Sequence, residues 1–359
     1  METKKKHLFI IYTPYQLLSA LNIYYERKLN SCYFVLVNSN MRKFIGYYDN
    51  FEGIKTIDLS EIYDDNVFTG FKAHLQILKD IPRKNRIISK QIALWQDVDE
   101  LFIPSDDMIV RIIYKKVKKN NTQVILSLMD DGIGTYNGRM HYRKRLLSVI
   151  FYAIFLNKNF YESISYIYCY HPELFKTSLN GIEIKKIMMN QVIVASFYPL
   201  ASKAIDSYLG KKIIFLDQGY VNDHIQECLK CISRHFNNEE VIIKKHPRID
   251  TKVDYLAFHV VEDGLPTEIL FPLLKLDNTL VVSVDSTGCI TPYLINEITP
   301  YCILLFEVLN KDDEGKCRKL FETINKGIGY NYVLMPKSVD EFEKMLVTIK
   351  NKLQGIVLE

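Results

Sequence analysis

The sequence predicts an α/β protein with two Rossmann-like domains, because short apolar strand-like segments alternate with helix-like segments along the whole chain. The chain has 359 residues, of which 48% are hydrophobic and 25% are charged, and these values are typical of a globular protein with two ordinary cores. Acidic and polar residues follow several of the strand-like segments. In open α/β folds these positions lie at the carboxyl edge of the sheet, where ligands bind.

The first half of the chain opens with a predicted strand over residues 7–12, and Pro14 then starts a helix that continues to about residue 27. Further elements are predicted as strands over 32–37, 101–104, 122–129 and 164–170, and as a helix over 108–119. Residues 146–156 are the longest apolar run, about half of what a bilayer crossing needs. We expect a buried helix there.

The alternative for this apolar run is an amphipathic contact with an anionic membrane surface, because a basic cluster directly precedes it. The cluster contains Arg139, His141, Arg143, Lys144 and Arg145. The only apolar run near the N-terminus covers residues 8–13 and is followed by Pro14, so we expect neither a secretory signal nor a membrane anchor there.

The second half repeats the pattern more regularly. Strands are predicted over 212–216, 241–245, 258–261, 279–284 and 301–305. Helices are predicted over 223–236, 266–276, 288–296, 315–325 and 339–353, and the last of these could pack on either domain. The second series begins between Ala195 and Leu209, so we place the domains at residues 1–200 and 201–359.

Charge and cysteine content narrow the function classes. With 46 Lys and Arg against 42 Asp and Glu, the net charge of +4 is too mild for a nucleic-acid coat but allows local anion-binding patches. The 7 cysteines fall mostly in apolar segments, which indicates reduced core thiols in a cytoplasm. Cys228 and Cys231 have metal or redox spacing, but they lie on a predicted helix and lack a second pair, so we expect a structural role.

Asp130-Asp131-Gly132 directly follows the predicted strand over 122–129. The same string is also a common turn, since Asp accepts local backbone hydrogen bonds and Gly supplies a positive φ. Its place at the carboxyl edge of a sheet favours a functional carboxylate.

A second motif, His246-Pro247-Arg248, follows the predicted strand over 241–245, and Lys244 and Lys245 precede it. The dipeptide alone is not specific, because His171-Pro172 also follows a strand-like run. The basic neighbours favour His246 as a group that faces an anion.

Ser286, Thr287 and Gly288 follow the predicted strand over 279–284 and open the next helix. Hydroxyls and free N–H groups at a helix N-terminus suit an anion, although plain N-capping uses the same groups. Glu268 lies in the first turn of the helix before, where it either complements the helix dipole or holds a ribose hydroxyl or a base amino group. No strand is followed by a glycine-rich dinucleotide motif or a P-loop.

These motifs resemble those of the bacterial sialyltransferases of GT-B architecture, which include the lipooligosaccharide and polysialic acid capsule enzymes. The family has an acidic-acidic-Gly motif, a His-Pro motif and a Ser/Thr pair, and this sequence has Asp130-Asp131-Gly132, His246-Pro247 and Ser286-Thr287 in that order. Segment 11–18 is similar to the family's first strand and helix, so Thr13 and Gln16 join the candidates. Only some members share Arg248, and Thr287 replaces a serine of others.

The resemblance implies a GT-B-like fold with a cleft between an acceptor-binding first domain and a CMP-sugar-binding second domain. It implies that Asp131 or Asp130 is the base for the acceptor hydroxyl, and that His246, with Pro247, contacts the donor phosphate. It also implies that the hydroxyls of Ser286 and Thr287, beside Gly288, contact the same phosphate. Glu268 would contact the nucleotide. Arg248, Thr13 and Gln16 are further candidates.

We therefore expect an inverting sialyltransferase that uses CMP-sialic acid, a cell-surface glycan acceptor such as lipooligosaccharide or capsule, no cofactor and no metal. We also expect a cytoplasmic protein, at the inner membrane face if Arg139, Arg143, Lys144 and Arg145 contact anionic lipid. The alternatives are transfer of Kdo or another CMP-activated nonulosonic acid, and a non-catalytic nucleotide-sugar-binding protein of polysaccharide assembly. A metal-dependent hydrolase lacks the further ligands that it would need near Asp130.

Overall fold

The computed structural model divides the chain into two compact units, Met1–Asn190 and Gln191–Glu359. It describes residues 5–45, 47–48, 51–62, 70–136, 160–174, 182–218, 223–245, 253–296, 300–309, 316–329 and 331–353. The division lies upstream of residue 200 because helices α6 (Gln191–Ser196) and α7 (Tyr198–Tyr208) pack against the 267–273 segment of the second unit. The basic residues 139–145 and the apolar run 146–156 lie outside the described residues.

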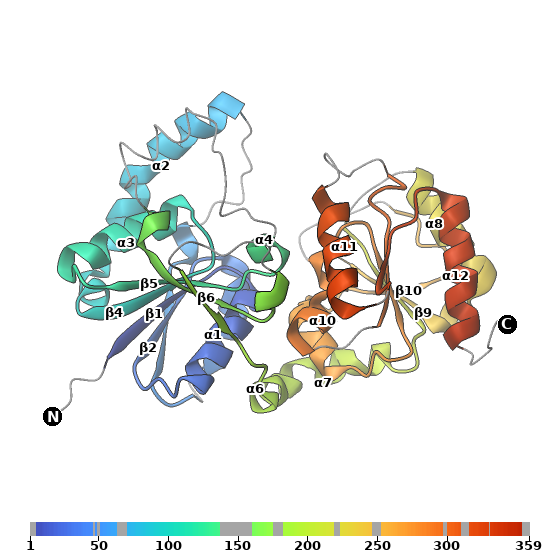
Figure 1. Cartoon of the computed structure of the whole chain (residues 1–359), viewed down its shortest axis with the longest axis horizontal. Helices are drawn as coiled ribbons and strands as arrows, with labels where there is room; N and C mark the ends of the chain where they lie inside the picture. Colours follow the sequence, from blue (N-terminus) through green and yellow to red (C-terminus); the bar gives the residue numbers. More distant parts are fainter. Residues whose placement is uncertain are drawn as a thin grey trace. The chain divides into compact units, whose positions relative to one another are not determined.

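The first unit contains a seven-stranded parallel sheet (Figure 1). Its strands are β1 (Lys6–Ile11), β2 (Cys32–Leu36), β3 (Ile54–Asp58), β4 (Val98–Ile103), β5 (Ile125–Met129), β6 (Ile164–Cys169) and β7 (Glu183–Lys186). The order is β3-β2-β1-β4-β5-β6-β7, so the winding direction reverses between β1 and β4. In doubly wound sheets this reversal opens a crevice at the carboxyl edge.

Helices connect these strands. They are α1 (Pro14–Glu26), α2 (Gly70–Lys90), α3 (Met108–Asn120) and the short α4 (Ile133–Tyr136). Right-handed crossovers in opposite directions place α1 on one face of the sheet and α3 on the other, as Figure 1 shows. Thr13 caps α1 and Pro14 occupies its first turn, where the missing N–H is no loss.

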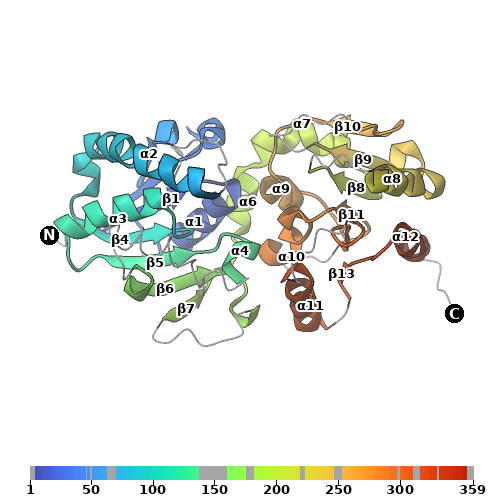
Figure 2. The same cartoon turned by 90° about the horizontal axis from the view of Figure 1, so that it is seen from above.

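The second unit repeats the same winding with six parallel strands (Figure 2). They are β8 (Ile213–Leu216), β9 (Val241–Lys244), β10 (His259–Val261), β11 (Leu280–Ser283), β12 (Tyr301–Leu304) and β13 (Val333–Leu334), in the order β10-β9-β8-β11-β12-β13. The winding direction reverses between β8 and β11. Its longer helices are α8 (Asp223–His235), α11 (Lys316–Ile328) and α12 (Val339–Leu353).

Two predicted helices of this unit are shorter in the structure. The helix expected over 266–276 is α9 (Thr267–Leu270) followed by a 3₁₀ turn (Phe271–Leu273), because Pro272 has no N–H with which to continue an α-helix. The helix expected over 288–296 is a 3₁₀ turn (Thr287–Cys289) followed by α10 (Thr291–Asn296).

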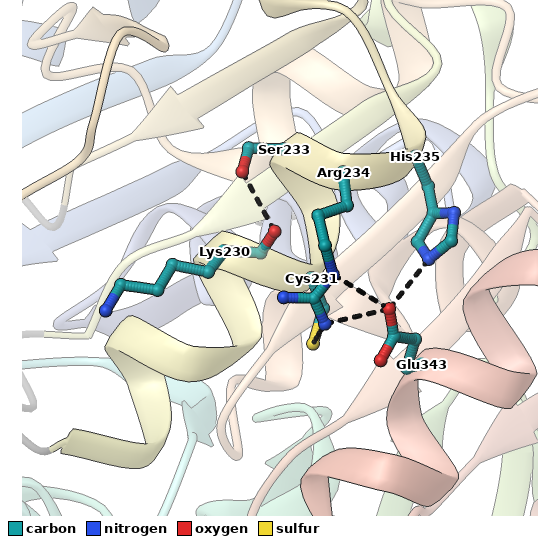
Figure 3. Close-up of polar contacts among 6 residues, drawn as sticks. All are labelled: Lys230, Cys231, Ser233, Arg234, His235 and Glu343. Carbon is teal, nitrogen blue, oxygen red and sulfur yellow. Dashed lines mark hydrogen bonds and ion pairs between the residues drawn. The ribbon is translucent and has the colours of Figure 1, made fainter.

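The closing helix α12 packs on α8 in the second unit, which decides between the two positions left open by the sequence. Phe342, Leu346 and Ile349 form its buried face. Figure 3 shows Glu343 of α12 bound by Arg234 and His235 of α8, with Oε1 2.8 Å from Arg234 Nη2 and 2.9 Å from His235 Nε2.

Cys228 and Cys231 lie on the buried side of α8 and are free thiols. Burial raises the pKa of Cys228 to about 12, so the thiol is protonated at neutral pH and packs as a small apolar side chain.

Among the helices of the described ranges, none is both long enough and apolar enough to cross a bilayer.

Candidate functional site

Asp130 lies at the end of β5 and is completely buried, with 0% of its surface exposed. Its Oδ1 accepts the Gly132 N–H at 2.8 Å, and its Oδ2 accepts the Tyr170 N–H at 3.1 Å and the Tyr136 hydroxyl. Burial raises the pKa of Asp130, and these hydrogen bonds offset the rise only in part. The carboxylate therefore ties β5 to the residues that follow β6.

Asp131 is only half-buried. Its backbone N–H donates to Thr135 Oγ1 at 2.7 Å, and its Oδ1 accepts a hydrogen bond from the side-chain amide of Gln16. Gly132 follows with a φ of +78°, a conformation that glycine adopts without strain, and the chain turns there into α4. An ionised carboxylate at this edge can accept a proton from a bound hydroxyl group.

Gln16 is the third residue of α1 and is buried. Its Oε1 accepts the backbone N–H groups of Tyr12 at 2.6 Å and Thr13 at 3.3 Å, while Thr13 Oγ1 accepts the Gln16 N–H at 3.3 Å. This is a capping box. Of the two candidates from segment 11–18, Gln16 contacts Asp131 and Thr13 holds the helix start.

In the second unit the structure brings Thr267 and Glu268 next to Ser286 and Gly288. A Cβ on Gly288 would lie 2.8 Å from Thr267 Oγ1 and 3.2 Å from Ser286 Oγ, so only glycine fits without displacement. The Gly288 N–H donates to Ser286 Oγ at 3.1 Å. The side chain of Thr287 lies outside the described residues.

Glu268 is held close to this turn. Burial raises its pKa, while its own backbone N–H, the Thr267 hydroxyl 3.3 Å from its Oε2 and the charge of Lys244 act in the opposite direction. A carboxyl group of this kind is suited to hydrogen bonding with a neutral ligand group rather than to ion pairing at the surface.

Gln218 and Asp285, which were not predicted from the sequence, bridge β8 and β11 where the winding reverses. Gln218 Nε2 donates to Asp285 Oδ1 at 2.7 Å, and Gln218 Oε1 accepts the Ser283 hydroxyl at 2.7 Å and the Asp285 N–H at 2.8 Å. The position of Gln218, just after the first strand of the second series, was the available signal. Asp285 directly precedes Ser286, and both residues follow the end of β11.

His246, Pro247 and Arg248 lie outside the described residues, but the strand that leads to them is described. Lys244 Nζ lies 2.5 Å from Asp263 Oδ1, and Lys245 Nζ lies 2.5 Å from Glu262 Oε1. Burial lowers the pKa of Lys244, and the negative charge of Asp263 opposes this shift. Each lysine is therefore compensated by a carboxylate.

The second His-Pro dipeptide lies in the first unit. His171 is 3% exposed, its Nδ1 lies 2.5 Å from Glu173 Oε1, and its backbone N–H donates to Tyr136 at 3.2 Å. His171 is thus a buried member of the Asp130 network. Among the described residues, no group of three or more His, Cys, Asp or Glu side chains could hold a metal ion.

The family model described as alpha-2,8-polysialyltransferase (POLYST) matches residues 7–304 of this chain. This range includes every predicted site residue. No curated protein matches the sequence.

Solved glycosyltransferases are similar in structure. The Arabidopsis thaliana protein UGT89C1, complexed with UDP-L-rhamnose, has a TM-score of 0.56 and 12% identity, covering 99% of this chain and 93% of its own. The calicheamicin glycosyltransferase CalG4 has a TM-score of 0.54 and 9% identity, covering 99% and 94%. LpCGTa, in complex with UDP, has a TM-score of 0.54 and 9% identity, covering 96% and 90%. These similarities confirm the predicted GT-B fold.

Proposed function

This chain belongs to the alpha-2,8-polysialyltransferase family and has a GT-B glycosyltransferase fold, and from this premise we propose that it transfers sialic acid from CMP-sialic acid to a glycan hydroxyl. The observation that carries the proposal is the contrast between Asp130 and Asp131. Only Asp131 combines partial exposure with a fixed orientation at the carboxyl edge of β5. A general base needs both properties.

The proposed reaction is a single displacement with inversion at the anomeric carbon. The acceptor oxygen bonds to the anomeric carbon of sialic acid, the bond from that carbon to the phosphate oxygen breaks, and CMP departs with the electron pair. Asp131 accepts the proton of the acceptor hydroxyl. The leaving phosphate needs hydrogen-bond donors or positive charge while its own negative charge develops.

In this proposal the second unit supplies those groups. Ser286, Thr287 and the backbone of Gly288 contact the phosphate, and Glu268 contacts the cytidine. The support is the direct approach of the Thr267–Glu268 turn to the Ser286–Gly288 turn. We assign His246 to the phosphate as well, with Pro247 and Arg248 beside it, from the family's His-Pro motif.

The family description suggests the acceptor. An alpha-2,8 linkage requires a sialic acid hydroxyl as the attacking group, so we assign a sialylated cell-surface glycan, of lipooligosaccharide or capsule type, as the acceptor. Arg139, Arg143, Lys144 and Arg145 would bring the enzyme to the cytoplasmic face of the membrane by attraction to anionic lipids.

Two measurements test the function. Thermal shift with CMP, UDP, GDP and CDP should give stabilisation by CMP alone, because a ligand that binds only the native state raises Tm. Incubation with CMP-sialic acid and a fluorescent sialylated oligosaccharide should give products one sialic acid larger by mass spectrometry. Stabilisation by UDP instead would overturn the donor assignment.

The same transfer assay tests whether the reaction depends on a metal ion and whether one of the alternative functions applies. Activity should persist in EDTA, and complete loss restored by Mg²⁺ or Mn²⁺ would overturn the metal-independent mechanism. Transfer from CMP-Kdo or another CMP-nonulosonic acid, without transfer from CMP-sialic acid, would mean that the assigned donor sugar is wrong. Binding of CMP without any transfer would indicate the non-catalytic polysaccharide-assembly protein.

A further inference from the structure

The side chain of Gln16 connects the start of α1 to the carboxylate at the end of β5. We propose that Gln16 is a positioning residue that holds the Asp131 carboxylate in the orientation that the transfer reaction requires. The inference rests on the proposed function and on the hydrogen bond between Gln16 and Asp131.

The surrounding backbone determines which way the amide points. Tyr12 and Thr13 both present N–H donors, so the atom that faces them must be the acceptor Oε1. Nε2 is then directed at Asp131 Oδ1. Gln16 cannot turn its amide over without placing donors against donors, and it is buried, so water cannot easily replace the lost partners.

This hydrogen bond has two consequences for a base. Fixing Oδ1 restricts rotation of the carboxylate, and so limits where Oδ2 can lie when it receives the acceptor proton. A hydrogen-bond donor next to a carboxylate also favours the ionised form, which is the form that can accept a proton. Both effects should appear in turnover rather than in donor affinity.

The tyrosines near Asp131 do not carry a charge that could replace the effect of Gln16 on the Asp131 carboxylate. Titratable side chains in the hydrogen-bond networks of Asp131 and Asp130, within the described ranges, include Tyr12, Tyr15, Asp130, Tyr136, Tyr170, His171 and Glu173. Burial raises the pKa of Tyr15, Tyr136 and Tyr170, so all three are neutral at physiological pH. Asp130 is buried against its own partners.

Gln16→Glu separates positioning from helix capping. A glutamate at the third helical position still accepts the Tyr12 and Thr13 N–H groups, as in the usual capping box, so the variant keeps the cap of α1. The ionised glutamate cannot donate to Asp131 and adds a like charge beside it, which favours a proton shared between the two carboxylates. The acid limb of the kcat/KM profile should therefore move up by about one pH unit or more, with activity recovering at alkaline pH.

Two further variants serve as references. Gln16→Met loses both the capping acceptor and the donor, so it should lower Tm and also reduce kcat. Asn121→Ala removes a hydrogen bond of 2.9 Å to the Val98 carbonyl at the start of β4, on the opposite edge of the sheet. It should lower Tm and leave the pH profile unchanged.

The experiment measures kcat/KM from pH 5 to pH 9 with CMP-sialic acid, together with Tm and CMP affinity by calorimetry. A wild-type profile in Gln16→Glu, or a uniform loss with an unmoved acid limb, would overturn the positioning role while leaving the proposed function intact. A wild-type enzyme without transferase activity would overturn the proposed function and this role together. A shifted limb with unchanged CMP affinity supports both.

Discussion

Asp130 and Asp131 are adjacent in the sequence, yet their carboxylates lie in different surroundings. Asp130 is fully enclosed and accepts hydrogen bonds from two backbone N–H groups and the Tyr136 hydroxyl, whereas Asp131 is half-buried and is held by Gln16. The backbone that follows β6 and the Tyr136 hydroxyl of α4 enclose Asp130, whereas Asp131 lies one residue further from the end of β5. The pair can therefore divide a structural role and a chemical role.

Asp131→Asn should lower kcat by ~10²-fold or more, the usual scale for loss of a general base, while CMP affinity stays near wild type. Initial rates and calorimetric titration with CMP measure the two quantities separately. Near-full turnover in this variant would contradict the assignment of Asp131 as the base.

Asp130→Asn is the matched control at the neighbouring position. The new amide would point N–H groups at donors that now find a carboxylate, so we expect destabilisation of about 1–3 kcal/mol. Urea denaturation measures this change. If Asp130→Asn leaves stability unchanged but abolishes turnover, the chemical role belongs to Asp130.

His246→Ala should weaken CMP binding and reduce turnover, because we assign this side chain to the donor phosphate. His171→Ala provides the comparison, since the same dipeptide occurs there but the imidazole is buried against Glu173. His171→Ala should lower Tm and leave CMP affinity unchanged. If calorimetry shows the reverse pattern, the nucleotide site has been assigned to the wrong strand end.

Gly288→Ala should destabilise the protein by about 1–3 kcal/mol, typical of overpacking, and should weaken CMP binding. Its Cβ would lie 2.8 Å from Thr267 Oγ1 and 3.2 Å from Leu216 Cδ1. Thr267→Ala removes the closer contact. In a double-mutant cycle by urea denaturation, the Gly288→Ala penalty should be smaller in the Thr267→Ala background. Equal penalties in both backgrounds would show that Leu216, not Thr267, limits the space.

The sequence predicted the alternating architecture and most strands, because the central strands are continuous apolar runs with clear turn signals at their ends. It missed β3, β7 and β13, which are all edge strands. Residues of β3 and β7 are largely polar with exposed positions, and β13 has only two residues. It also missed α2, whose apolar residues are spaced among many charges. Edge strands and surface helices bury less apolar surface, so their patterns are weaker.

For the candidate site, position along the chain selected Asp130, Asp131, Glu268 and the 286–288 turn as candidates, and their functional roles remain predictions. It could not separate Asp130 from Asp131, since burial depends on how β6 and α4 pack around them. Nor could it find the Gln218–Asp285 contact, which joins strands 67 residues apart. Such bridges depend on strand order, and strand order cannot be read from local periodicity.

The contact between Glu343 on α12 and Arg234 with His235 on α8 predicts a pH-dependent stability (Figure 3). The hydrogen bonds from Arg234 and then His235 hold the pKa of Glu343 below its ordinary value. A depressed carboxyl pKa contributes stability above the unfolded pKa, about 4.3 for Glu, and that contribution is lost as the pH falls through the folded value.

Glu343→Gln should therefore lower Tm at pH 7, and the difference in Tm between wild type and variant should be smaller at pH 4 than at pH 7. Glu341→Gln is the control, because it removes the same charge from α12 but its carboxylate accepts the Lys337 N–H instead of contacting α8. Differential scanning fluorimetry at both pH values measures the difference, and hydrogen exchange in α12 locates it. Equal Tm values for wild type and Glu343→Gln at pH 7 would mean that the apolar face of Phe342, Leu346 and Ile349 holds the helix without help from the ion pair.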